Sequence, residues 1–436
     1  MRQWNCSPHC RIDLSMTLEE DHMSHPSTPP TVIATLDIAK HTHWFAVFAP
    51  DLTPIIPPHP ITTDATALQS VITTLAQLAL AGPVALAMEP TSIYHLPWLH
   101  ALTAALPPTV TCLLVHTTAV HHARTRLTAG RLRKTDARDC HAIAAAVRDG
   151  HGRPWSPPSP QQAQFRTWAA QEAATMETLT QLAHALQRLT DLLWPGLVAR
   201  RNAASTPLVS SRLWTRHIIQ TILLHHPDPH TWRSLSVAAI RARLKALGMR
   251  CGIGRATHLA AILAAQVVLP PEQTPPLAAR LTTLMQQYCH HATHLAALHA
   301  EAETLVAASW AAVLCSIPGM SPVLAARYAA AVGDIHTITS AKALWSLAGL
   351  EPSIYASGVR SRVGQSSLAG RITLRQALIR IGASLSRHCP PVRACWLAAR
   401  ARRKPLAVAL IHAANKANRL LFALAISQQP YQPGRA

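Results

Sequence analysis

Acidic residues are scarce in this chain of 436 residues. It contains 20 Asp and Glu against 40 Lys and Arg, so its formal net charge is +20. Glu351 is the last acid, and the 85 residues after it carry 14 Lys and Arg and no Asp or Glu. A segment of one charge sign repels itself unless a polyanion neutralises it, and the phosphate backbone of a nucleic acid is the simplest such partner. We therefore expect a nucleic-acid-binding protein.

Long apolar runs and paired cysteine motifs are also absent. No stretch approaches the ~18 consecutive apolar residues of a transmembrane helix, although apolar residues make up 49% of the chain. That content excludes a disordered chain and is enough for sizeable cores. The nine Cys form no CxxC pair typical of a zinc or redox site. We expect free thiols, a cytoplasmic and nucleoid-associated location, and no membrane partner.

Strand and helix patterns divide the chain into regions. We expect residues 1–30 to be a disordered leader, with Met16 and Met23 as alternative starts. Four β-rich apolar runs separated by helical patterns predict an α/β domain over residues 31–153, and the first two runs predict a hairpin. The Pro-rich stretch 50–60 is expected to be a loop. The four runs are 31–37, 43–48, 84–89 and 111–116.

Helices are expected to dominate after the Pro-rich boundary at 154–160. Residues 154–311 contain two long helix candidates and indicate a helical or coiled-coil region for oligomerisation. Residues 312–425 predict a mainly α C-terminal domain with a helix-hairpin-helix-like element at 316–334, and residues 426–436 a tail. The second long helix, about 278–309, carries a heptad seam that fits a dimer or an antiparallel pair within one chain equally well. The seam positions are Leu284, Tyr288, His291, Leu295, Leu298, Ala302 and Leu305.

Four acids stand out in the predicted α/β domain. Asp37 and Glu89 each end a predicted strand, where ligand sites of open α/β sheets gather. Asp136 and Asp139 are three residues apart and share one face of a predicted helix. Any one of these acids alone fits a helix cap or a surface charge. As a set they predict a site for divalent cations that act on a phosphodiester.

A group of cations surrounds the last two acids in the sequence. Six Lys and Arg lie within 15 residues and are expected to attract phosphates to the acidic site. A solvated basic helix end is the alternative explanation. The six residues are Arg124, Arg126, Arg131, Arg133, Lys134 and Arg138.

Several of these motifs resemble transposases of the insertion sequence 110 family, including its 1111 branch. The matching N-terminal segments are TLDIAKHTHWFAV, LAMEPTSIY and RKTDARDCHAIA. The matching C-terminal segments are SIPGMSPVLAARYAAAVGDI, AKALWSLAGLEPSIYASG and RSRVGQSSLAGRITLRQAL. The resemblance covers about residues 31–425.

The resemblance implies a RuvC-like, ribonuclease-H-type N-terminal domain with an Asp-Glu-Asp-Asp tetrad and Mg²⁺ or Mn²⁺. The tetrad falls on Asp37, Glu89, Asp136 and Asp139. It also implies a DNA transposase that excises and integrates a mobile element. The partners that it implies are double-stranded DNA, a structured noncoding guide RNA and further copies of the chain, as a dimer or tetramer.

The family pattern places a serine nucleophile at Ser357, within the string Tyr355 to Gly358. From the residues alone, Ser357-Gly358 is equally a simple turn, and no base lies nearby in sequence. Nearby arginines are able to bind a scissile phosphate through two hydrogen bonds each. They are Arg360, Arg362, Arg371 and Arg375.

Two alternatives remain open at this point. One is a metal-dependent nuclease, similar to a Holliday-junction resolvase, that uses water as its nucleophile and does not need Ser357. The other is an inactive copy that only binds nucleic acid.

Overall fold

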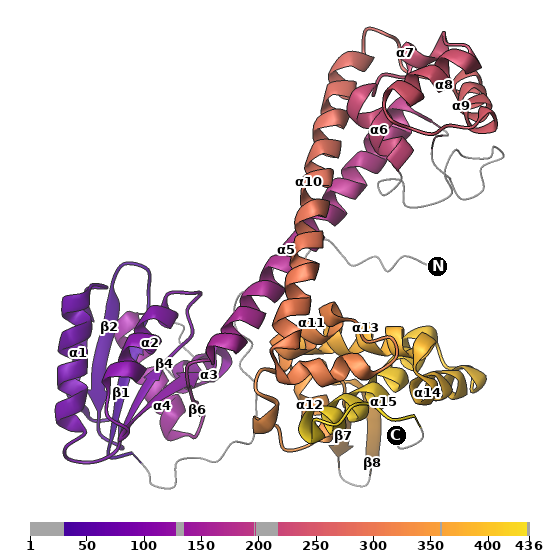
Figure 1. Ribbon diagram of the computed structural model, residues 1–436. Helices are drawn as coiled ribbons and strands as arrows, with labels where there is room; N and C mark the ends of the chain where they lie inside the picture. Colours follow the sequence, from indigo (N-terminus) through magenta and orange to yellow (C-terminus); the bar gives the residue numbers. More distant parts are fainter. Residues whose placement is uncertain (1–29, 128–134, 196, 198–216, 358–359, 434–436) are drawn as a thin grey trace. The chain divides into compact units, whose positions relative to one another are not determined.

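The computed structural model describes residues 30–127, 135–195, 197, 217–357 and 360–433, and for residues 353–365 the backbone alone. The chain divides into two compact units. One comprises residues 1–160 and 338–376, and the other comprises residues 161–337 and 377–436. Figure 1 labels most of the helices and strands of both units.

A six-stranded mixed sheet forms the centre of the N-terminal part. Its strand order is β3-β2-β1-β4-β5-β6, with β1, β4 and β5 parallel and the other strands antiparallel to their neighbours. The predicted α/β class and the predicted hairpin of the first two strands are confirmed. The strands are β1 (Val32–Asp37), β2 (His43–Phe48), β3 (Pro54–Ile61), β4 (Val84–Met88), β5 (Val110–Val115) and β6 (Gly152–Pro154).

The prediction of a loop over residues 50–60 was wrong, because β3 occupies most of that stretch. Proline has no backbone N–H to donate, so it is tolerated in a strand that has a neighbour on one side only. Among the described strands, β3 is such an edge strand and pairs with β2 alone. The Pro residues of β3 therefore fit the sheet and also protect its edge from further strand pairing.

Helices cover both faces of the sheet. On one face, Leu36 and Leu86 pack with Leu75 of α1 and Leu99 of α2. On the other face, Ala87 and Leu113 pack with residues of α3 and α4, among them Ala123 and Ile143. Small alanines along α4 allow it to lie close to the strands. The helices are α1 (Ala65–Leu78), α2 (His95–Ala105), α3 (Thr117–Leu127) and α4 (Asp136–Arg148).

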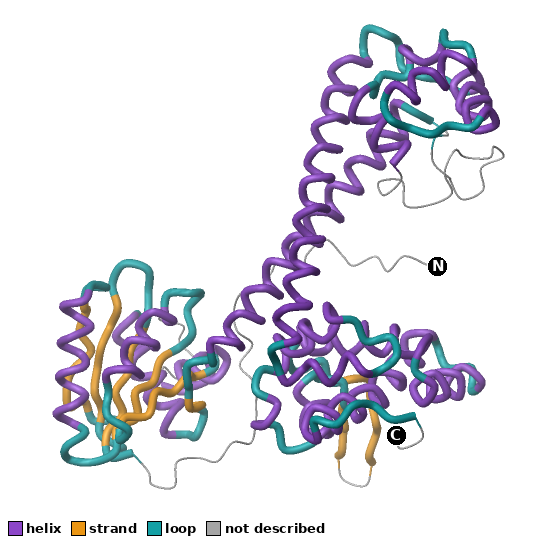
Figure 2. The backbone as a smooth tube through the Cα atoms, viewed as in Figure 1, coloured by secondary structure: helices purple, strands orange, loops and turns teal. Residues whose placement is uncertain are grey.

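Two long helices, α5 (Pro160–Leu193) and α10 (Thr274–Ala307), run antiparallel within the chain (Figure 2). Trp168 near the start of α5 donates its indole N–H to the carbonyl oxygen of Leu298 near the end of α10, at 2.7 Å. At the opposite ends, Leu186 of α5 belongs to the same apolar cluster as Leu281 and Met285 of α10. The predicted long helices are confirmed, and the apolar seam of the second helix is used at least in part inside one chain.

Short helices complete the far end of the helix pair. They enclose a core with Trp194, Trp232 and Ile222, and these three side chains are almost fully buried. The helices are α6 (His217–His225), α7 (His230–Arg233), α8 (Val237–Ala246) and α9 (Ile253–Ala265).

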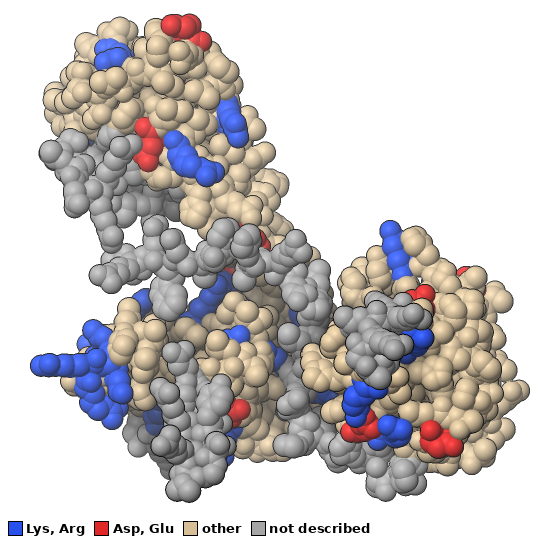
Figure 3. Space-filling model, turned by 180° about the vertical axis from the view of Figure 1, so that it is seen from behind, with Lys and Arg blue, Asp and Glu red and all other residues tan. Residues whose placement is uncertain are grey.

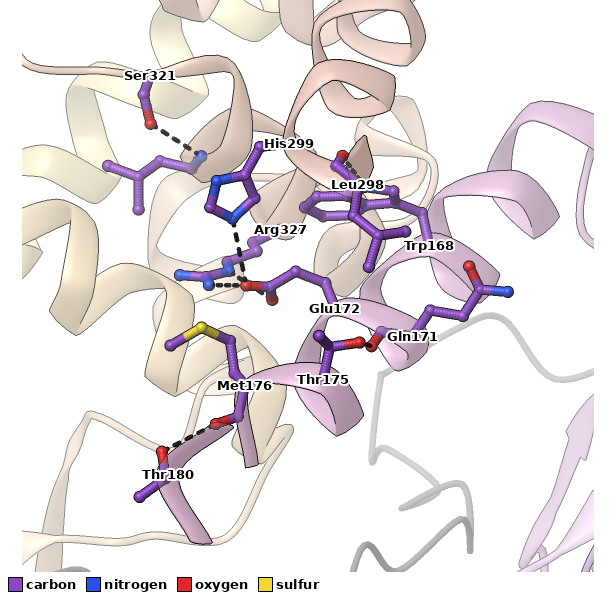
Figure 4. A network of polar contacts seen from close by, with 11 residues as sticks. Trp168, Gln171, Glu172, Thr175, Met176, Thr180, Leu298, His299, Ser321 and Arg327 are labelled. Atoms are coloured by element: carbon purple, nitrogen blue, oxygen red, sulfur yellow. Dashed lines mark hydrogen bonds and ion pairs between the residues drawn. The ribbon is translucent and has the colours of Figure 1, made fainter. Parts of the chain in front are cut away.

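A buried ion pair joins α5 and α10 to α11 (Pro322–Val332) at the other end (Figure 4). The guanidinium of Arg327 binds both carboxylate oxygens of Glu172, with Nε at 3.0 Å from Oε2. The imidazole of His299 on α10 lies 3.9 Å from the same carboxylate. Glu172 is only 2% exposed, so Arg327 supplies the neutralising charge that its burial requires.

The remaining helices of this unit are mainly C-terminal. Ser321 caps the N-terminus of α11 by accepting a hydrogen bond from the amide of Leu324, and Pro322 occupies the first turn. The helix-hairpin-helix assignment of this stretch stays a prediction. The elements are η2 (Trp310–Ser316), η3 (Ile335–Thr337), α13 (Ile372–His388), α14 (Pro390–Ala401) and α15 (Leu406–Ser427), and the first residues of α13 fall in the other unit.

A two-stranded hairpin follows α12 (Ala341–Leu347) in a region predicted to be mainly helical. β7 (Pro352–Ser357) and β8 (Arg360–Ser366) pair antiparallel. The few strand-forming residues of this stretch, Ile354, Tyr355 and Val363, do not alternate with polar residues and so give no strand pattern. None of the helices in the described ranges is long and apolar enough to cross a membrane.

Candidate active site

The pairing register brings two of the predicted acids to one edge of the sheet. Leu36 of β1 pairs with Met88 of the parallel strand β4, so Asp37 and Glu89 are the next residues on adjacent strands. Neighbouring strands lie about 4.8 Å apart. Side chains alternate between the two faces of a strand, and Ile33 and Ala87 face the α3–α4 side. By the same alternation Asp37 and Glu89 belong to that side. Both are half-buried.

The other two acids lie in the first turn of α4, which packs on this face. Asp139 is 3% exposed, whereas Asp136 is exposed at the start of the helix. A negative charge in the first turn is favoured by the helix dipole. Helix α4 therefore presents one buried and one exposed carboxylate at the end of the sheet where β1 and β4 finish.

The thiol of Cys140 on α4 lies close to the carboxylates of both Asp37 and Asp139. Burial, chiefly, raises the pKa of the Cys140 thiol to about 12, and the carboxylates of Asp37 and Asp139 both contribute to that rise. The thiol donates a long hydrogen bond to the carbonyl oxygen of Trp44 on β2, at 3.7 Å. The carboxylates of Asp37 on β1 and Asp139 on α4 therefore both raise the pKa of this one buried thiol, which lies against the sheet.

Asp139 is bound by a cation of the protein. The Nε atom of Arg124, at the end of α3, lies 2.6 Å from Oδ1 of Asp139, and both side chains are largely buried. The contact is a charge-assisted hydrogen bond. It holds Asp139 against α3 and partly neutralises the acidic edge. Sequence reasoning placed Arg124 among the DNA-binding residues and missed this contact, because nothing local links residues that are 15 positions apart.

The donor set fits a hard divalent cation. Mg²⁺ and Mn²⁺ prefer carboxylate oxygens, and the four acids supply only such oxygens along one edge of the sheet. Among the described residues, however, no three His, Cys, Asp or Glu side chains lie close enough together to hold one metal ion. Three of these acids would hold one ion only if their carboxylates lay closer together than they do here.

The other five cations that we expected to bind nucleic acid in this region differ in their surroundings. Arg126 on α3 pairs with Asp149 at the end of α4, and Arg148 contacts the same carboxylate at 3.3 Å. Arg138 is exposed on α4. The remaining three fall outside the described residues. They are Arg131, Arg133 and Lys134.

Two histidines near the acids in sequence have structural roles. His43 is buried on the opposite face of the sheet, where it packs edge-on against Trp98 of α2 with ring centroids 4.7 Å apart. Its Nδ1 accepts a hydrogen bond from the amide of Ala39, and burial lowers the pKa of the imidazole. His116 accepts a hydrogen bond from the amide of Thr118 at the start of α3.

Ser357 is the last residue of β7 and pairs with Arg360 of β8, so it lies where the hairpin reverses. Arg362 pairs with Tyr355 two positions further along. Side chains of residues 353–365 are outside the description, and the predicted contacts of Ser357, Arg360 and Arg362 with a phosphate stay predictions. The backbone of Ser357 pairs with that of Arg360 on the opposite strand of the hairpin.

The other two predicted arginines support the base of this hairpin. Arg375 donates from Nη1 to the carbonyl oxygens of Ala348 at 3.0 Å and Leu368 at 3.1 Å. Burial lowers the pKa of Arg371 to about 10 and also lowers that of Arg375. A Cβ at Gly370 would lie 2.7 Å from the backbone nitrogen of Gly349, so no other residue fits there without a backbone shift. The hairpin therefore starts from a rigid base.

Comparisons with known proteins identify relatives of both halves. Residues 34–195 match the DEDD transposase model of the IS110 type, and residues 311–397 match a model described as transposase IS116/IS110/IS902 family. A probable family 20 transposase of Pseudomonas aeruginosa is 31% identical over 124 residues, which are 28% of this chain and 37% of that protein. The transposase for insertion sequence element IS1111A of Coxiella burnetii is 32% identical over 122 residues, which are 27% of this chain and 34% of that protein. The chain thus spans about a third of the length of these curated relatives.

Solved structures similar to the N-terminal part include RuvC of Thermus thermophilus. The complex of that protein with a Holliday junction substrate has a TM-score of 0.23 and 16% identity, covering 29% of this chain and 99% of RuvC. A second RuvC structure has a TM-score of 0.22 and 17% identity, covering 28% and 99%. The mixed sheet with helices on both faces fits the RNase H-like α/β class. With the two family models, which cover the sheet domain and the start of the C-terminal region, the chain belongs to the IS110 family of transposases.

Proposed function

We propose that this protein is a DNA transposase that excises and integrates an insertion sequence by cutting and rejoining DNA strands. One observation carries the proposal beyond family membership. The β1–β4 register puts Asp37 and Glu89 on adjacent strand ends, and α4 brings Asp139 to the same edge. A group of carboxylates in a chain with a net charge of +20 suits metal-assisted chemistry on phosphate.

Asp37, Glu89, Asp136 and Asp139 would hold Mg²⁺ or Mn²⁺. The ion would supply charge to the scissile phosphate and lower the pKa of the attacking hydroxyl. The protein's own part is to keep two acids on rigid strand ends and two on the first turn of α4. Arg124, whose Nε lies 2.6 Å from Oδ1 of Asp139, holds that carboxylate in place.

Ser357 is the proposed nucleophile. Its Oγ would form a bond to phosphorus while the bond from phosphorus to the leaving strand oxygen breaks, and that oxygen takes the proton. Rejoining reverses these changes with a new strand hydroxyl. In this proposal Ser357, at the end of β7, would present its hydroxyl to DNA, and Arg360, its partner in the strand pairing, would neutralise phosphate charge.

The partners follow from the charge and the family. Double-stranded DNA suits the C-terminal 85 residues, which contain 14 Lys and Arg and no acid. We extend the proposal to a structured noncoding guide RNA, which the family resemblance implies. We also extend it to a dimer or tetramer, because rejoining two duplexes needs several active sites. In this scheme residues 31–153 hold the metal, residues 154–311 carry the oligomer contacts, and residues 312–425 bind DNA and present Ser357.

A covalent-adduct assay tests the serine mechanism. The full chain is incubated with Mg²⁺, RNA transcribed from the flank of the element, and end-labelled junction DNA, and the products are separated on a denaturing gel. We expect a protein–DNA band that disappears in Ser357→Ala and persists in Ser361→Ala, a matched change on the facing strand.

The alternatives give different gels. Cut DNA without an adduct, unchanged in Ser357→Ala, would favour a resolvase-like nuclease with water as the nucleophile. DNA binding with no cutting under any metal or RNA condition would indicate an inactive binding copy.

A further inference from the structure

The turn between α14 and α15 is strongly basic. Four cations at this turn have exposed side chains, and we call this group the basic turn. They are Arg400, in the last turn of α14, and Arg402, Arg403 and Lys404 after it. Arg393, two helical turns before Arg400 on α14, is also exposed. In Figure 3 a dense group of Lys and Arg side chains covers this end of α14.

The basic turn has a defined conformation. The amide of Lys404 donates to the carbonyl oxygen of Ala399 at 3.2 Å, and the amide of Arg403 donates to that of Arg400 at 2.9 Å. The guanidinium of Arg400 donates to the carbonyl oxygen of Lys404 at 2.7 Å. The first contact is the helix-ending pattern in which a left-handed residue follows the helix. The cations are therefore presented on a fixed turn.

Arg403 is an unfavourable choice for this conformation. Its φ of 55° is left-handed, where glycine is the usual residue and an L side chain is strained. Folding stability alone would favour glycine at this position. An exposed arginine at a position that favours glycine is consistent with a use for its charge there.

Among the described residues, no carboxylate pairs with the cations of the basic turn. Every acid in the chain lies at or before Glu351. The positive potential of the turn is therefore available to an external polyanion.

The arrangement favours the backbone of duplex DNA over single strands. Single-stranded nucleic acids are held largely by stacking bases on exposed aromatic side chains. The aromatic residue between Arg393 and Pro405 is Trp396, which is partly buried and has a buried indole nitrogen. From Arg393 to Arg400 the helix rises about 10.5 Å, which corresponds to roughly three base-pair steps along the duplex axis at about 3.4 Å each. A row of cations on this scale suits sequence-independent contacts along one groove edge.

We propose that Arg393 and the basic turn form a phosphate-binding site that docks duplex DNA on the α14–α15 end of the C-terminal region. The site lies outside the acidic edge and the serine hairpin, and its role in positioning DNA rests on the proposed transposase function. The segment 400–404 also lies beyond the matched family region, which ends at residue 397.

Salt-dependent DNA binding by the full chain tests this site. Fluorescence anisotropy is recorded with a labelled duplex of arbitrary sequence over a range of salt concentrations. The test variant is the triple change Arg402→Gln, Arg403→Gln and Lys404→Gln. We expect the slope of log K against log salt to become shallower by about 2 to 3, because each lost phosphate contact contributes about 0.9.

A matched control variant distinguishes the loss of a specific phosphate-binding site from a general loss of positive charge. The triple change Lys245→Gln, Arg250→Gln and Arg255→Gln removes the same charge from exposed positions around α8 and α9. We expect it to change the slope by less than about 1. Equal losses in the two triple variants would overturn the inference.

A second variant guards against misfolding as the cause. Arg403→Gly removes one cation and relieves the left-handed strain. We expect its melting temperature to be equal to or higher than that of the wild type, with a slope about 1 shallower. A lower melting temperature or an unchanged slope would contradict the proposal.

Competitors then identify the source of the phosphates. Unlabelled duplex DNA should displace the label from wild type, and the test triple should lose affinity mainly for that duplex. A selective loss of affinity for single strands or for duplex RNA would refute the assignment to DNA. Failure of the wild-type chain to bind any duplex would refute the proposed function itself, whereas wild-type binding with an unaffected triple variant would refute only this site.

Discussion

The arginines at the acidic sheet edge and those of the basic turn carry the same guanidinium group. They differ in whether a carboxylate of the protein already binds that group. Arg124 is largely buried and lies 2.6 Å from Asp139, and Arg126 pairs with Asp149. Arg402 and Arg403 are exposed, and among the described residues they have no carboxylate partner. A count of Lys and Arg in the sequence therefore overestimates what a polyanion can reach. The nearby acids decide whether a cation holds the fold together or binds a ligand.

The largest effect should come from the acidic edge. Asp37→Asn keeps the size of the side chain and removes one proposed metal ligand. We expect DNA cleavage to fall by at least about 100-fold, while the affinity for duplex DNA is retained or rises slightly. Single-turnover cleavage and anisotropy on the same preparation measure both quantities.

The basic-turn triple variant is the matched comparison for that experiment. It should lower DNA affinity and leave the cleavage rate at saturating DNA nearly unchanged. If Asp37→Asn instead cleaves at the wild-type rate, the metal assignment of the acidic edge is wrong.

Stability should separate the two kinds of arginine next. Arg124→Ala leaves the buried carboxylate of Asp139 without its cation, and we expect the free energy of unfolding to fall by about 3 kcal/mol. Arg402→Ala removes an exposed, unpaired cation and should change it by less than about 0.5 kcal/mol. Urea denaturation of both variants gives the two values. Similar losses in the two variants would mean that the contact between Arg124 and Asp139 does not stabilise the fold.

The smallest expected effect is a pH dependence confined to the sheet domain. Burial lowers the pKa of His43 below its ordinary 6.5, so protonation is resisted in the folded state. The stabilising contribution is present above pH 6.5 and is lost as the pH falls, because the unfolded chain then binds a proton that the folded chain does not. We expect His43→Gln to flatten the fall in melting temperature between pH 6.5 and 5.

A surface substitution provides the control for this last prediction. His336→Gln changes an exposed histidine in the other compact unit and should leave the pH profile of the wild type intact. An unaltered profile in His43→Gln would show that other groups control the acid sensitivity.

Local pattern predicted much of the architecture. Apolar runs predicted β1, β2, β4 and β5, and helical spacing predicted α1, α2, α4, α5 and α10, because burial on one face leaves a short-range repeat in the sequence. The same method missed β3, where Pro concealed an edge strand, and the β7–β8 hairpin, whose few apolar residues form no alternating repeat. Both errors concern strands whose pairing depends on a neighbour more than on their own composition.

The sequence predicted which residues make up the candidate site, but it did not predict which residues they contact. The sequence by itself determined which four acids stand at strand ends and in a helix first turn, and it carried the motifs of the IS110 family, because these are local features. Only the tertiary structure decided that Asp37 lies beside Glu89, that Arg124 binds Asp139, and that α5 and α10 pair within one chain. Those contacts join residues far apart in sequence. They depend on strand register and helix packing, which arise from the fold as a whole.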